Sequence, residues 1–486
     1  MSSAAGTDTY DVIVIGGGPP GENAAQYAIQ GSDRTAVIVE HELVGGECSY
    51  WACMPSKALL RPVEVLTTAQ AMPGVQSIVG EHSLEVAAVL KRRDEFTHGR
   101  DDTSQVEWAS SIGIDVVRGH GRLDGERSVT VMAADGSTRT LHARHAVVLG
   151  TGTTASVPPV AGLREALPWT SRDVTNLVEV PRRVIVIGGG VVACESASWL
   201  RGLGVQELTI IEPGSALLAK NEPFAGALVQ AAFEQRGVRV ITGTSVDAVS
   251  RPGVTDTGYG RLHGGTVTVT AGGQALVADE LVVAAGRTPA STDLGLSSVG
   301  LADGGFIEVD DHLSVPGKDW LYVVGDLNGR ALLTHMGKYQ GRIIGAVIAA
   351  RATRTPLNGR EYLDVADHGA VPQVTFTDPQ VASVGLTEQR ARATGAEVEA
   401  VEYDLGALAG TSLLRDDYRG RAKLVIDRTS DTLLGATFVG PEVGELIHAA
   451  TVAIIGRVTL AELWHAVPSY PTASEIWLRL LETRRR

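Results

Sequence analysis

Residues 10–21 read YDVIVIGGGPPG, a mostly apolar run that ends in three spaced glycines, Gly16, Gly18 and Gly21. The apolar run is typical of a buried parallel strand, and a helical stretch over 22–30 follows it. In such a strand–turn–helix the first glycine permits a tight turn and the second lets backbone approach a pyrophosphate. The third lets the helix pack on the strand. We therefore predict a dinucleotide-binding turn at residues 16–21.

The first turn also has an acidic partner. A second apolar strand over 36–39 ends in Glu40, 19 residues past Gly21, where a carboxylate can accept hydrogen bonds from both ribose hydroxyls. A later apolar strand over 146–149 closes on Gly150-Thr151-Gly152. These features together predict a complete nucleotide unit rather than an isolated Gly-rich loop.

The same pattern recurs at residues 184–193, VIVIGGGVVA, with Gly188 and Gly190 in the turn. The strand that follows ends in Glu212, again 19 residues past the third small residue of the turn. Glu212 would accept hydrogen bonds from a ribose 2′-hydroxyl and repel a 2′-phosphate, and no arginine follows it at 213–215. We therefore expect a second nucleotide, NADH in preference to NADPH.

Cys48 and Cys53 lie in GGECSYWACMPSK, residues 45–57, just downstream of the first turn. The chain has only one other cysteine, Cys194, so a disulfide framework is excluded and the close pair favours redox chemistry. The spacing of the pair and the lack of a second Cys or His pair argue against zinc, and we predict no metal site. The alternative is two buried cysteines that pack as small apolar residues, as we expect for Cys194.

The composition limits the class of protein. The 42 basic and 56 acidic residues give a net charge of −14, which disfavours nucleic acid and anionic membranes as partners. No apolar run approaches the roughly 20 residues that span a bilayer. The first ten residues lack the basic and apolar regions of a secretion signal. We expect a cytoplasmic enzyme of several domains.

The motifs also occur in a specific order. The Gly-rich turn, Cys-x4-Cys-x-Pro-Ser-Lys, the second Gly-rich turn, Ala-Gly-Arg at 285–287 and Gly-Asp at 325–326 follow one another. This set resembles the FAD-dependent pyridine nucleotide-disulfide oxidoreductases, the family of dihydrolipoamide dehydrogenase, glutathione reductase and mercuric reductase, over nearly the whole chain.

The resemblance implies an α/β fold with two Rossmann-like dinucleotide-binding domains, for FAD and NAD, plus an α+β C-terminal dimerisation domain. We expect an FAD-binding domain with the redox Cys pair over 1–155, an NAD(P)H-binding domain over 156–284, a continuation of the FAD domain over 285–355 and an interface domain over 356–486.

The resemblance also assigns roles to residues. Cys53 is the flavin-side thiol and Cys48 the exchange thiol, Lys57 lies near flavin N5 and pairs with Glu195, and Asp326 binds the ribityl chain. A helix that opens near Thr334 and His335 would stabilise negative charge on the reduced ring. The full predicted cofactor-binding set is Gly16, Gly18, Gly21, Glu40, Gly46, Lys57, Gly121, Thr151, Gly152, Gly188, Gly190, Glu212, Gly286, Arg287, Asp326, Leu332, Thr334 and His335.

The C-terminal segment departs from the family. There a homodimer partner usually contributes His-Pro-Thr-x-x-Glu, in which the histidine is the general base for the outer cysteine. This chain has Tyr470-Pro471-Thr472 followed by Glu475. A phenol, with an ordinary pKa of about 10, does not accept a proton at neutral pH as an imidazole does. Losing a general base typically costs a factor of about 10² to 10⁴ in rate. His465 would substitute if its loop folds back.

Three functions remain open. The leading prediction is a homodimeric NADH-dependent enzyme that passes electrons through Cys53 and Cys48 to a disulfide acceptor, with Tyr470 and Glu475 of the other subunit lining the exit. The alternative is an NAD(P)H reductase in which flavin reduces a quinone, a metal ion or oxygen directly. The aromatic residues Tyr50 and Trp51 either narrow access to the thiols in such an enzyme or simply pack. A redox-sensing binding module is the third class.

Overall fold

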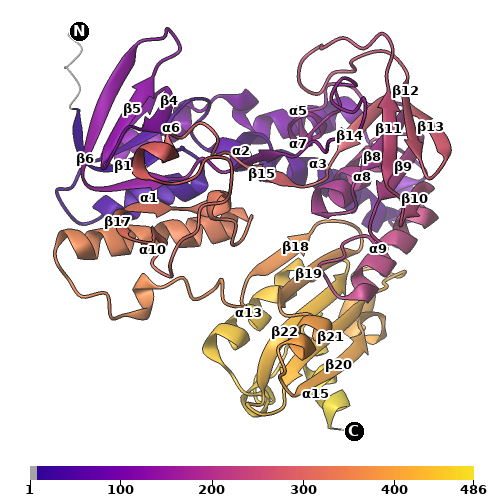
Figure 1. Cartoon of the computed structure of the whole chain (residues 1–486). Helices are drawn as coiled ribbons and strands as arrows, with labels where there is room; N and C mark the ends of the chain where they lie inside the picture. The colour runs from indigo at the N-terminus through magenta and orange to yellow at the C-terminus, as the bar shows by residue number, and fades with distance from the viewer. Residues whose placement is uncertain (1–7, 486) are drawn as a thin grey trace. The chain divides into compact units, whose positions relative to one another are not determined.

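The computed structural model describes residues 8–485, and Figure 1 traces the chain. The chain divides into two compact units, each built from separate stretches of sequence. Unit 1 comprises Met1–Met54, Asp94–Thr154 and Arg287–His368; unit 2 comprises Pro55–Arg93, Ala155–Gly286 and Gly369–Arg486. Among residues 8–485, no helix is long and apolar enough to cross a membrane. The four domain ranges expected from the sequence stay a prediction.

Unit 1 contains a mostly parallel sheet with the strand order β16-β17-β6-β1-β2-β3, in which β5 also pairs with β6 and β4 with β5. Strand β1 pairs in parallel with β2 and with β6, and Val12 and Val14 at its centre are fully buried. Burial on both faces explains the near-continuous apolar run. The strands are β1 Thr9–Ile15, β2 Ala36–Glu40, β3 Ile114–Arg118, β4 His120–Leu123, β5 Ser128–Met132, β6 Thr138–Leu149, β7 Thr153–Ala155, β15 Arg287–Pro289, β16 Ser314–Val315 and β17 Lys318–Val323.

Helices α1 (Pro19–Ile29) and α10 (Thr334–Ala352) lie side by side in unit 1 (Figure 1). Three glycines of α10, at 337, 341 and 345, face α1. A Cβ at Gly345 would lie 2.4 Å from the Tyr27 side chain, so only glycine allows this approach. The other helical segments of the unit are α2 Gly46–Tyr50, α6 Thr103–Ser111, η1 His98–Arg100, η2 Leu296–Val299, η3 Gly325–Asn328 and η4 Arg360–Tyr362.

Unit 2 contains a parallel sheet of order β10-β9-β8-β14, a three-stranded sheet β11-β12-β13 and an antiparallel sheet of order β18-β19-β22-β21-β20. Its strands are β8 Arg183–Ile187, β9 Glu207–Glu212, β10 Val238–Thr242, β11 Val246–Ser250, β12 Val267–Ala271, β13 Gln274–Ala278, β14 Glu280–Val283, β18 Pro372–Thr375, β19 Gln380–Gly385, β20 Val398–Asp404, β21 Arg421–Asp427 and β22 Thr432–Gly440.

The helices of unit 2 cover these sheets, and two of them, α3 and α5, begin or end in unit 1. They are α3 Cys53–Gln70, α4 Gln76–Val79, α5 Val86–Phe96, α7 Ser171–Thr175, α8 Val191–Gly202, α9 Pro223–Gln235, η5 Leu405–Ala407, α11 Glu388–Ala393, α12 Ala409–Ser412, η6 Val443–Leu446, α13 Ile447–Gly456, α14 Leu460–Leu463 and α15 Glu475–Arg484.

The predicted fold class is confirmed: in each of two sheets with parallel strands a Gly-rich turn follows the first strand, and a separate antiparallel sheet with helices forms the C-terminal part. In the C-terminal part a 3-10 turn, η6, leads into α13. The chain enters it from Glu442 in a left-handed conformation, with a φ of 58°.

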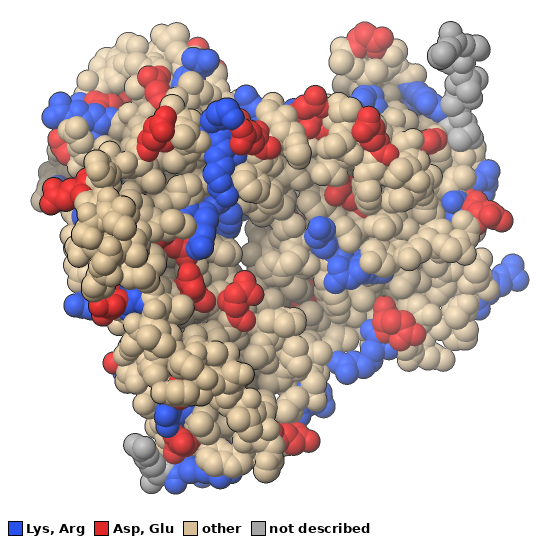
Figure 2. Space-filling view, turned by 180° about the vertical axis from the view of Figure 1, so that it is seen from behind, with Lys and Arg blue, Asp and Glu red and all other residues tan. Residues whose placement is uncertain are grey.

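Charged side chains of both signs are interspersed over the face shown in Figure 2. This mixture is typical of a solvated surface and unlike the one-signed basic stripe of a nucleic-acid-binding face.

Candidate functional site

The first Gly-rich turn has the backbone geometry that its glycines predict. Gly16 has a φ of +106°, and a Cβ there would lie 2.4 Å from the Gly150 carbonyl oxygen. A Cβ at Gly21 would lie 2.1 Å from the Gly16 oxygen. Gly18 is the N-cap of α1 and has no side-chain cap, while a Cβ there would meet nothing closer than 3.8 Å. The start of α1 therefore presents backbone N–H groups that a phosphate can accept.

Glu40 closes this turn at the end of β2. Its carboxylate accepts hydrogen bonds from the backbone N–H of Gly17 and of Glu42, both at 2.7 Å. Burial opposes ionisation of Glu40, but hydrogen bonds from His41, Glu42 and Gly17 outweigh it and hold the pKa of this carboxyl below its usual range. Glu40 is thus a fixed, ionised acceptor beside the turn.

Asp326 lies in η3, which follows β17. Thr153 of β7 contacts it directly, and Arg287 of β15 contacts Thr153. The Thr153 hydroxyl donates to Asp326 Oδ2 at 2.7 Å, and Arg287 Nε donates to Thr153 Oγ1 at 2.9 Å. Burial raises the pKa of Asp326 above its ordinary value. The sequence analysis predicted Asp326 and Arg287 as site residues but missed Thr153. Its position immediately after Gly152 was the sequence feature that could have indicated it.

The two thiols of the redox pair meet at the ends of three helices in unit 1. Cys48 lies in α2, Cys53 begins α3, and both are free and half-buried. The Cys53 sulfur is 3.3 Å from the hydroxyl oxygen of Thr334, the first residue of α10. The hydrogen bond with Cys53, and then burial, raises the pKa of Cys48 above its ordinary value. The positive end of the α10 dipole would stabilise a thiolate at Cys53.

The turn before Cys48, at Gly45 and Gly46, packs against the start of α1. Gly45 donates its N–H to the Gly17 oxygen at 2.7 Å. Gly46, with a φ of +54°, approaches so closely that a Cβ there would lie 2.9 Å from Gly18 Cα. The predicted cofactor residue Gly46 therefore fixes α2, and with it Cys48, against the nucleotide-binding turn.

Tyr50 and Trp51, between the two cysteines, are packed side chains. Their exposed fractions are 1% and 5%. The Tyr50 hydroxyl donates to the Val44 oxygen at 3.1 Å, and the Arg100 guanidinium lies 5.2 Å from the Trp51 ring. These contacts favour the packing alternative over a role in binding an acceptor.

The second Gly-rich turn, in unit 2, repeats the first. Gly188 has a φ of +113°, and a Cβ there would lie 2.4 Å from the Ala284 oxygen. Gly190 is the N-cap of α8 and no atom lies within 4 Å of the position of its Cβ. Glu212, at the end of β9, accepts a hydrogen bond from Gly214 N–H at 2.6 Å. The turn presents the same open helix start and the same fixed carboxylate.

Lys57 and Glu195 form an ion pair in unit 2, with Nζ 2.8 Å from Oε2. Glu195 is buried in α8, and its other oxygen accepts the Phe376 N–H at 2.9 Å. The ammonium lies 4.7 Å from the centre of the Phe376 ring. The predicted pair is therefore present. Phe376 contacts both Lys57 and Glu195, but no sequence pattern indicated this role.

The other predicted residues occupy supporting positions. Thr151 donates to the Ala290 oxygen at 2.8 Å, and Gly121 lets β4 pack on β1 and β2, since a Cβ there would lie 2.9 Å from Val39. Gly152 and Gly286 have positive φ. Leu332 and His335 are exposed at the start of α10. Cys194 is fully buried and donates to the Gly189 oxygen at 3.5 Å, as a packing residue does.

Residues 10–351 match the family described as pyridine nucleotide-disulphide oxidoreductase. The chain belongs to this family. Residues 371–480 match the dimerisation domain of the same family. This oxidoreductase is therefore a flavoprotein enzyme that uses FAD and a pyridine nucleotide.

Curated relatives cover nearly the whole oxidoreductase. The dihydrolipoyl dehydrogenase of Chlorobaculum tepidum is 33% identical over 471 residues, which is 96% of this chain and 95% of the relative. That of Chlamydia pneumoniae is 31% identical, over 97% of this chain and 96% of the relative. A mercuric reductase of Bacillus cereus is 29% identical over 97% of this chain but 70% of its own length.

Solved structures agree on the fold of the oxidoreductase. LpdA of Mycobacterium tuberculosis superposes with a TM-score of 0.80 at 25% identity, covering 98% of this chain and 99% of that one. The flavoprotein disulfide reductase RclA of Escherichia coli, in its Cu(II) complex, superposes with a TM-score of 0.82 at 23% identity over 98% and 99% of the two chains.

The C-terminal segment of the oxidoreductase exposes Tyr470, at whose position the family resemblance led us to expect a histidine. Tyr470 is 74% exposed, and His465 is exposed as well. Glu475 is buried, and its Oε2 has no hydrogen-bond partner. Residues 471–474 line a pocket of about 820 Å³ in unit 2 together with Lys57 and Phe376.

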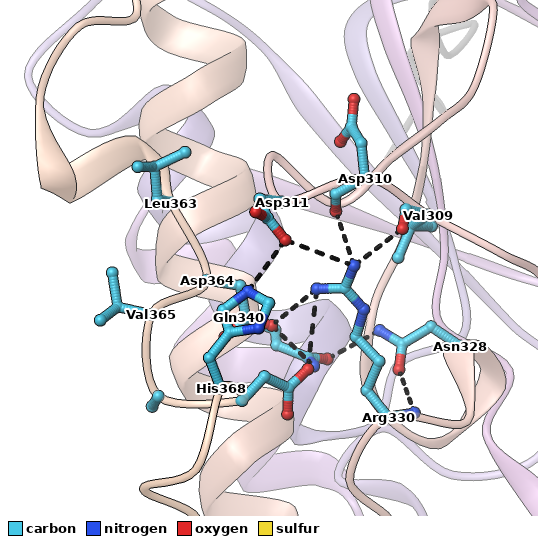
Figure 3. A network of polar contacts seen from close by, with 12 residues as sticks. Val309, Asp310, Asp311, Asn328, Arg330, Gln340, Leu363, Asp364, Val365 and His368 are labelled. Atoms are coloured by element: carbon cyan, nitrogen blue, oxygen red, sulfur yellow. Dashed lines mark hydrogen bonds and ion pairs between the residues drawn. The ribbon is translucent and has the colours of Figure 1, made fainter. Parts of the chain in front are cut away.

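Sequence reasoning missed an ionic network around Arg330 in the oxidoreductase (Figure 3). The guanidinium donates to the Val309 oxygen at 2.7 Å and lies 3.5 Å from Asp364 and 3.7 Å from Asp367. Gln340 joins this network to η3, because it accepts the Gly325 N–H at 2.9 Å and donates to Asp364 at 3.3 Å. The network therefore braces the backbone that carries Asp326.

Arg330→Met is expected to lower the free energy of unfolding by about 3 kcal/mol, because it leaves buried carboxylates without their cation. Burial, with repulsion from Asp364, raises the pKa of Asp367 to about 7. Asp367 is thus neutral at pH 5 and ionised at pH 8, so the folded protein loses stability as pH rises through this range. The loss caused by Arg330→Met should accordingly be larger at pH 8.

Urea unfolding of the FAD-loaded protein at both pH values measures this difference. Arg419→Met, at an exposed arginine, is the matched control and should change the free energy by less than about 0.5 kcal/mol. An equal loss at pH 5 and pH 8 would contradict the role given to Asp367.

Proposed function

We propose that this oxidoreductase is a cytoplasmic NADH-dependent enzyme of the dihydrolipoamide dehydrogenase type, which reduces a disulfide acceptor through Cys53 and Cys48. The observation that carries the proposal is the thiol pair, with the Cys53 sulfur 3.3 Å from the first hydroxyl of α10. The dihydrolipoyl dehydrogenases among the relatives support the choice of acceptor class.

The residues of unit 1 fit FAD. The uncapped start of α1 and the open space at Gly18 suit a pyrophosphate. Glu40 suits a ribose, and the buried Asp326 carboxyl suits the hydroxyls of a ribityl chain. FAD, when bound, accepts a hydride from the nicotinamide and delivers an electron pair to a disulfide.

The residues of unit 2 support NADH as the reductant. The Glu212 carboxylate is fixed by Gly214 at the edge of the second turn, where it accepts a 2′-hydroxyl and repels a 2′-phosphate. The buried Glu195 carboxylate holds Lys57 Nζ in place through an ion pair of 2.8 Å. A charged Lys57 would assist hydride arrival at the flavin, as the family resemblance implies.

Thiol–disulfide exchange is then performed by this chain's own residues. In the reduced enzyme the Cys48 sulfur attacks one sulfur of the acceptor disulfide, and the other sulfur leaves as a thiol with the proton that Cys48 gives up. The Cys53 thiolate then attacks the Cys48 sulfur, which restores the Cys48–Cys53 disulfide and releases the second sulfur as a thiolate that takes a proton from water. The α10 dipole stabilises Cys53 as the thiolate.

The proposal includes a homodimer, which the match of 371–480 to the family's dimerisation domain supports. Within one chain the Tyr470 side chain is exposed to solvent. In the proposed homodimer it would contact the second subunit. At the partner's Cys48 a tyrosine would hydrogen-bond a thiol or ligand without acting as a base.

Tyr470 also favours a second candidate function. If no base serves Cys48, the flavin would reduce a quinone, a metal ion or oxygen directly and the thiols would be regulatory. The intact Cys48–Cys53 pair and the Lys57–Glu195 ion pair favour the disulfide route.

Anaerobic titration of the purified yellow protein with NADH, and in parallel with NADPH, tests the proposal. We expect a long-wavelength band, from a cysteine thiolate next to oxidised flavin, after two electrons and before the flavin bleaches, with NADH acting much the faster. Immediate bleaching without the band would favour the second candidate, and quinones, metal ions and oxygen would then be assayed. Equal rates with the two nucleotides would refute the role of Glu212.

A further inference from the structure

Residues 251–266 form a long connection between β11 and β12, although these strands are antiparallel partners that a short turn could join. The connection is held in place by hydrogen bonds. The Gly260 oxygen accepts the Val178 N–H at 2.8 Å, and Trp169 Nε1 donates to the Arg261 oxygen at 3.0 Å. Loops of this length without secondary structure of their own are usually either functional or disordered. Because this one is fixed, a function is the expected reason for its length.

The connection and residues 157–173 together line a pocket of about 430 Å³ within unit 2. Binding sites for small molecules have volumes of this order. Val157, Leu167 and Pro168 contribute apolar walls. Leu167 has a φ of 47°, a left-handed conformation that is uncommon for leucine and that occurs more often at binding sites. The walls suit an aliphatic or aromatic group.

His263 of the connection lines the pocket and is buried, with an exposed fraction of 6%. Its Nδ1 accepts the Thr257 backbone N–H at 3.3 Å. In the neutral ring Nδ1 therefore carries no proton and Nε2 carries one. Within residues 8–485 this Nε2–H has no hydrogen-bond partner. A buried donor without an acceptor is costly, so the ring indicates an acceptor supplied by a bound molecule.

Arg164 and Asp256 add one charge of each sign to the lining. Arg164 Nη2 donates to the Val157 oxygen at 2.9 Å, and Asp256 Oδ1 accepts the Gly258 N–H at 2.9 Å. These bonds fix both side chains at the pocket. In the described part of the chain, neither the other guanidinium nitrogens of Arg164 nor Asp256 Oδ2 makes a hydrogen bond. A cation and an anion are thus both available to a bound molecule.

Asp173 is the other carboxylate of the lining, and it is buried. Its oxygens accept the backbone N–H of Thr170 at 2.8 Å and that of Gly260 at 3.3 Å. Both oxygens are therefore used within the protein. The charges left for a bound molecule are those of Arg164 and Asp256.

We propose that this pocket binds a free amino acid with an apolar side chain. The carboxylate of the amino acid accepts hydrogen bonds from Arg164 and from His263 Nε2–H, and its ammonium group donates to Asp256. Its side chain lies against Val157 and Leu167. A zwitterion matches the two charges, whereas a simple anion would be repelled by Asp256. No residue of the pocket belongs to either Gly-rich turn or to the thiol pair, so the inference does not depend on the disulfide route.

Isothermal titration calorimetry of the FAD-loaded enzyme with L-phenylalanine tests the proposal. We expect saturable binding of one molecule per chain. 3-Phenylpropionate lacks the ammonium group and phenethylamine lacks the carboxylate. Each should bind at least about tenfold more weakly, because each loses a charge-assisted hydrogen bond. Equal binding of 3-phenylpropionate would overturn the proposal, as would the absence of saturable binding of L-phenylalanine at millimolar concentrations.

Variants of the two exposed charged residues place the binding in this pocket. Arg164→Met and Asp256→Asn should each weaken the binding of L-phenylalanine at least about tenfold, and neither removes a buried side chain. Asp256→Asn should also bind 3-phenylpropionate more tightly than the wild type does, because the repulsion is gone. Arg261→Met, at an exposed arginine of the same connection outside the lining, is the matched control and should bind as the wild type does. Unchanged affinity in both pocket variants would overturn the proposal.

Discussion

Cys48→Ser is expected to lower turnover with lipoamide or another disulfide by a factor of about 10³ or more, while flavin reduction by NADH keeps its wild-type rate. A hydroxyl cannot replace the sulfur that forms the mixed disulfide, and loss of a nucleophile typically removes most of the rate enhancement. The residues proposed to bind NADH, Glu212 and Gly190 among them, lie in unit 2, so we expect that the first half of the reaction does not need Cys48.

Stopped-flow absorbance of the flavin, followed by steady-state assays with the disulfide, measures the two halves separately. Cys194→Ser is the matched control, because Cys194 is buried and bonded to the Gly189 backbone, so turnover should persist. Full turnover in Cys48→Ser would refute the disulfide route and support direct reduction of an acceptor by flavin.

Gly21→Ala is expected to prevent accumulation of folded, FAD-loaded protein. The added Cβ would lie 2.1 Å from the Gly16 carbonyl oxygen and 3.1 Å from Val14. Because both neighbours belong to the buried strand and its turn, neither can move without breaking the sheet, and overpacking of this kind destabilises by about 1–3 kcal/mol or more. The displaced turn also loses its fit to a pyrophosphate.

The flavin content of the soluble protein and its melting temperature measure the effect. Gly305→Ala, where no atom lies within 4 Å of the Cβ position, should leave both unchanged. Gly18→Ala should separate the two effects, because its Cβ has room in the protein but stands where a pyrophosphate approaches. Normal flavin content in Gly21→Ala would contradict the strain described for the turn.

The sequence predicted those parts of the site that depend on local geometry. Gly16, Gly21 and Gly188 are required by turns of a few residues, and Glu40 and Glu212 follow from the length of a strand–helix–strand unit. Their positions in the structure agree with that reasoning.

Other parts of the site depend on contacts between distant segments, which carry no local pattern. Thr153 reaches Asp326 across 173 residues, and Phe376 reaches Glu195 across 181.

The sheet of unit 1 has a consequence for biosynthesis. Strand β17, at residues 318–323, completes the edge of β6, and Thr334 of α10 supplies the neighbour of Cys53. A chain emerging from the ribosome therefore makes its nucleotide turn and both cysteines long before the strand and helix that enclose them. Because domains fold as units during synthesis, flavin loading must wait until α10 has left the exit tunnel. Until then the edge of β6 that pairs with β17 stays open.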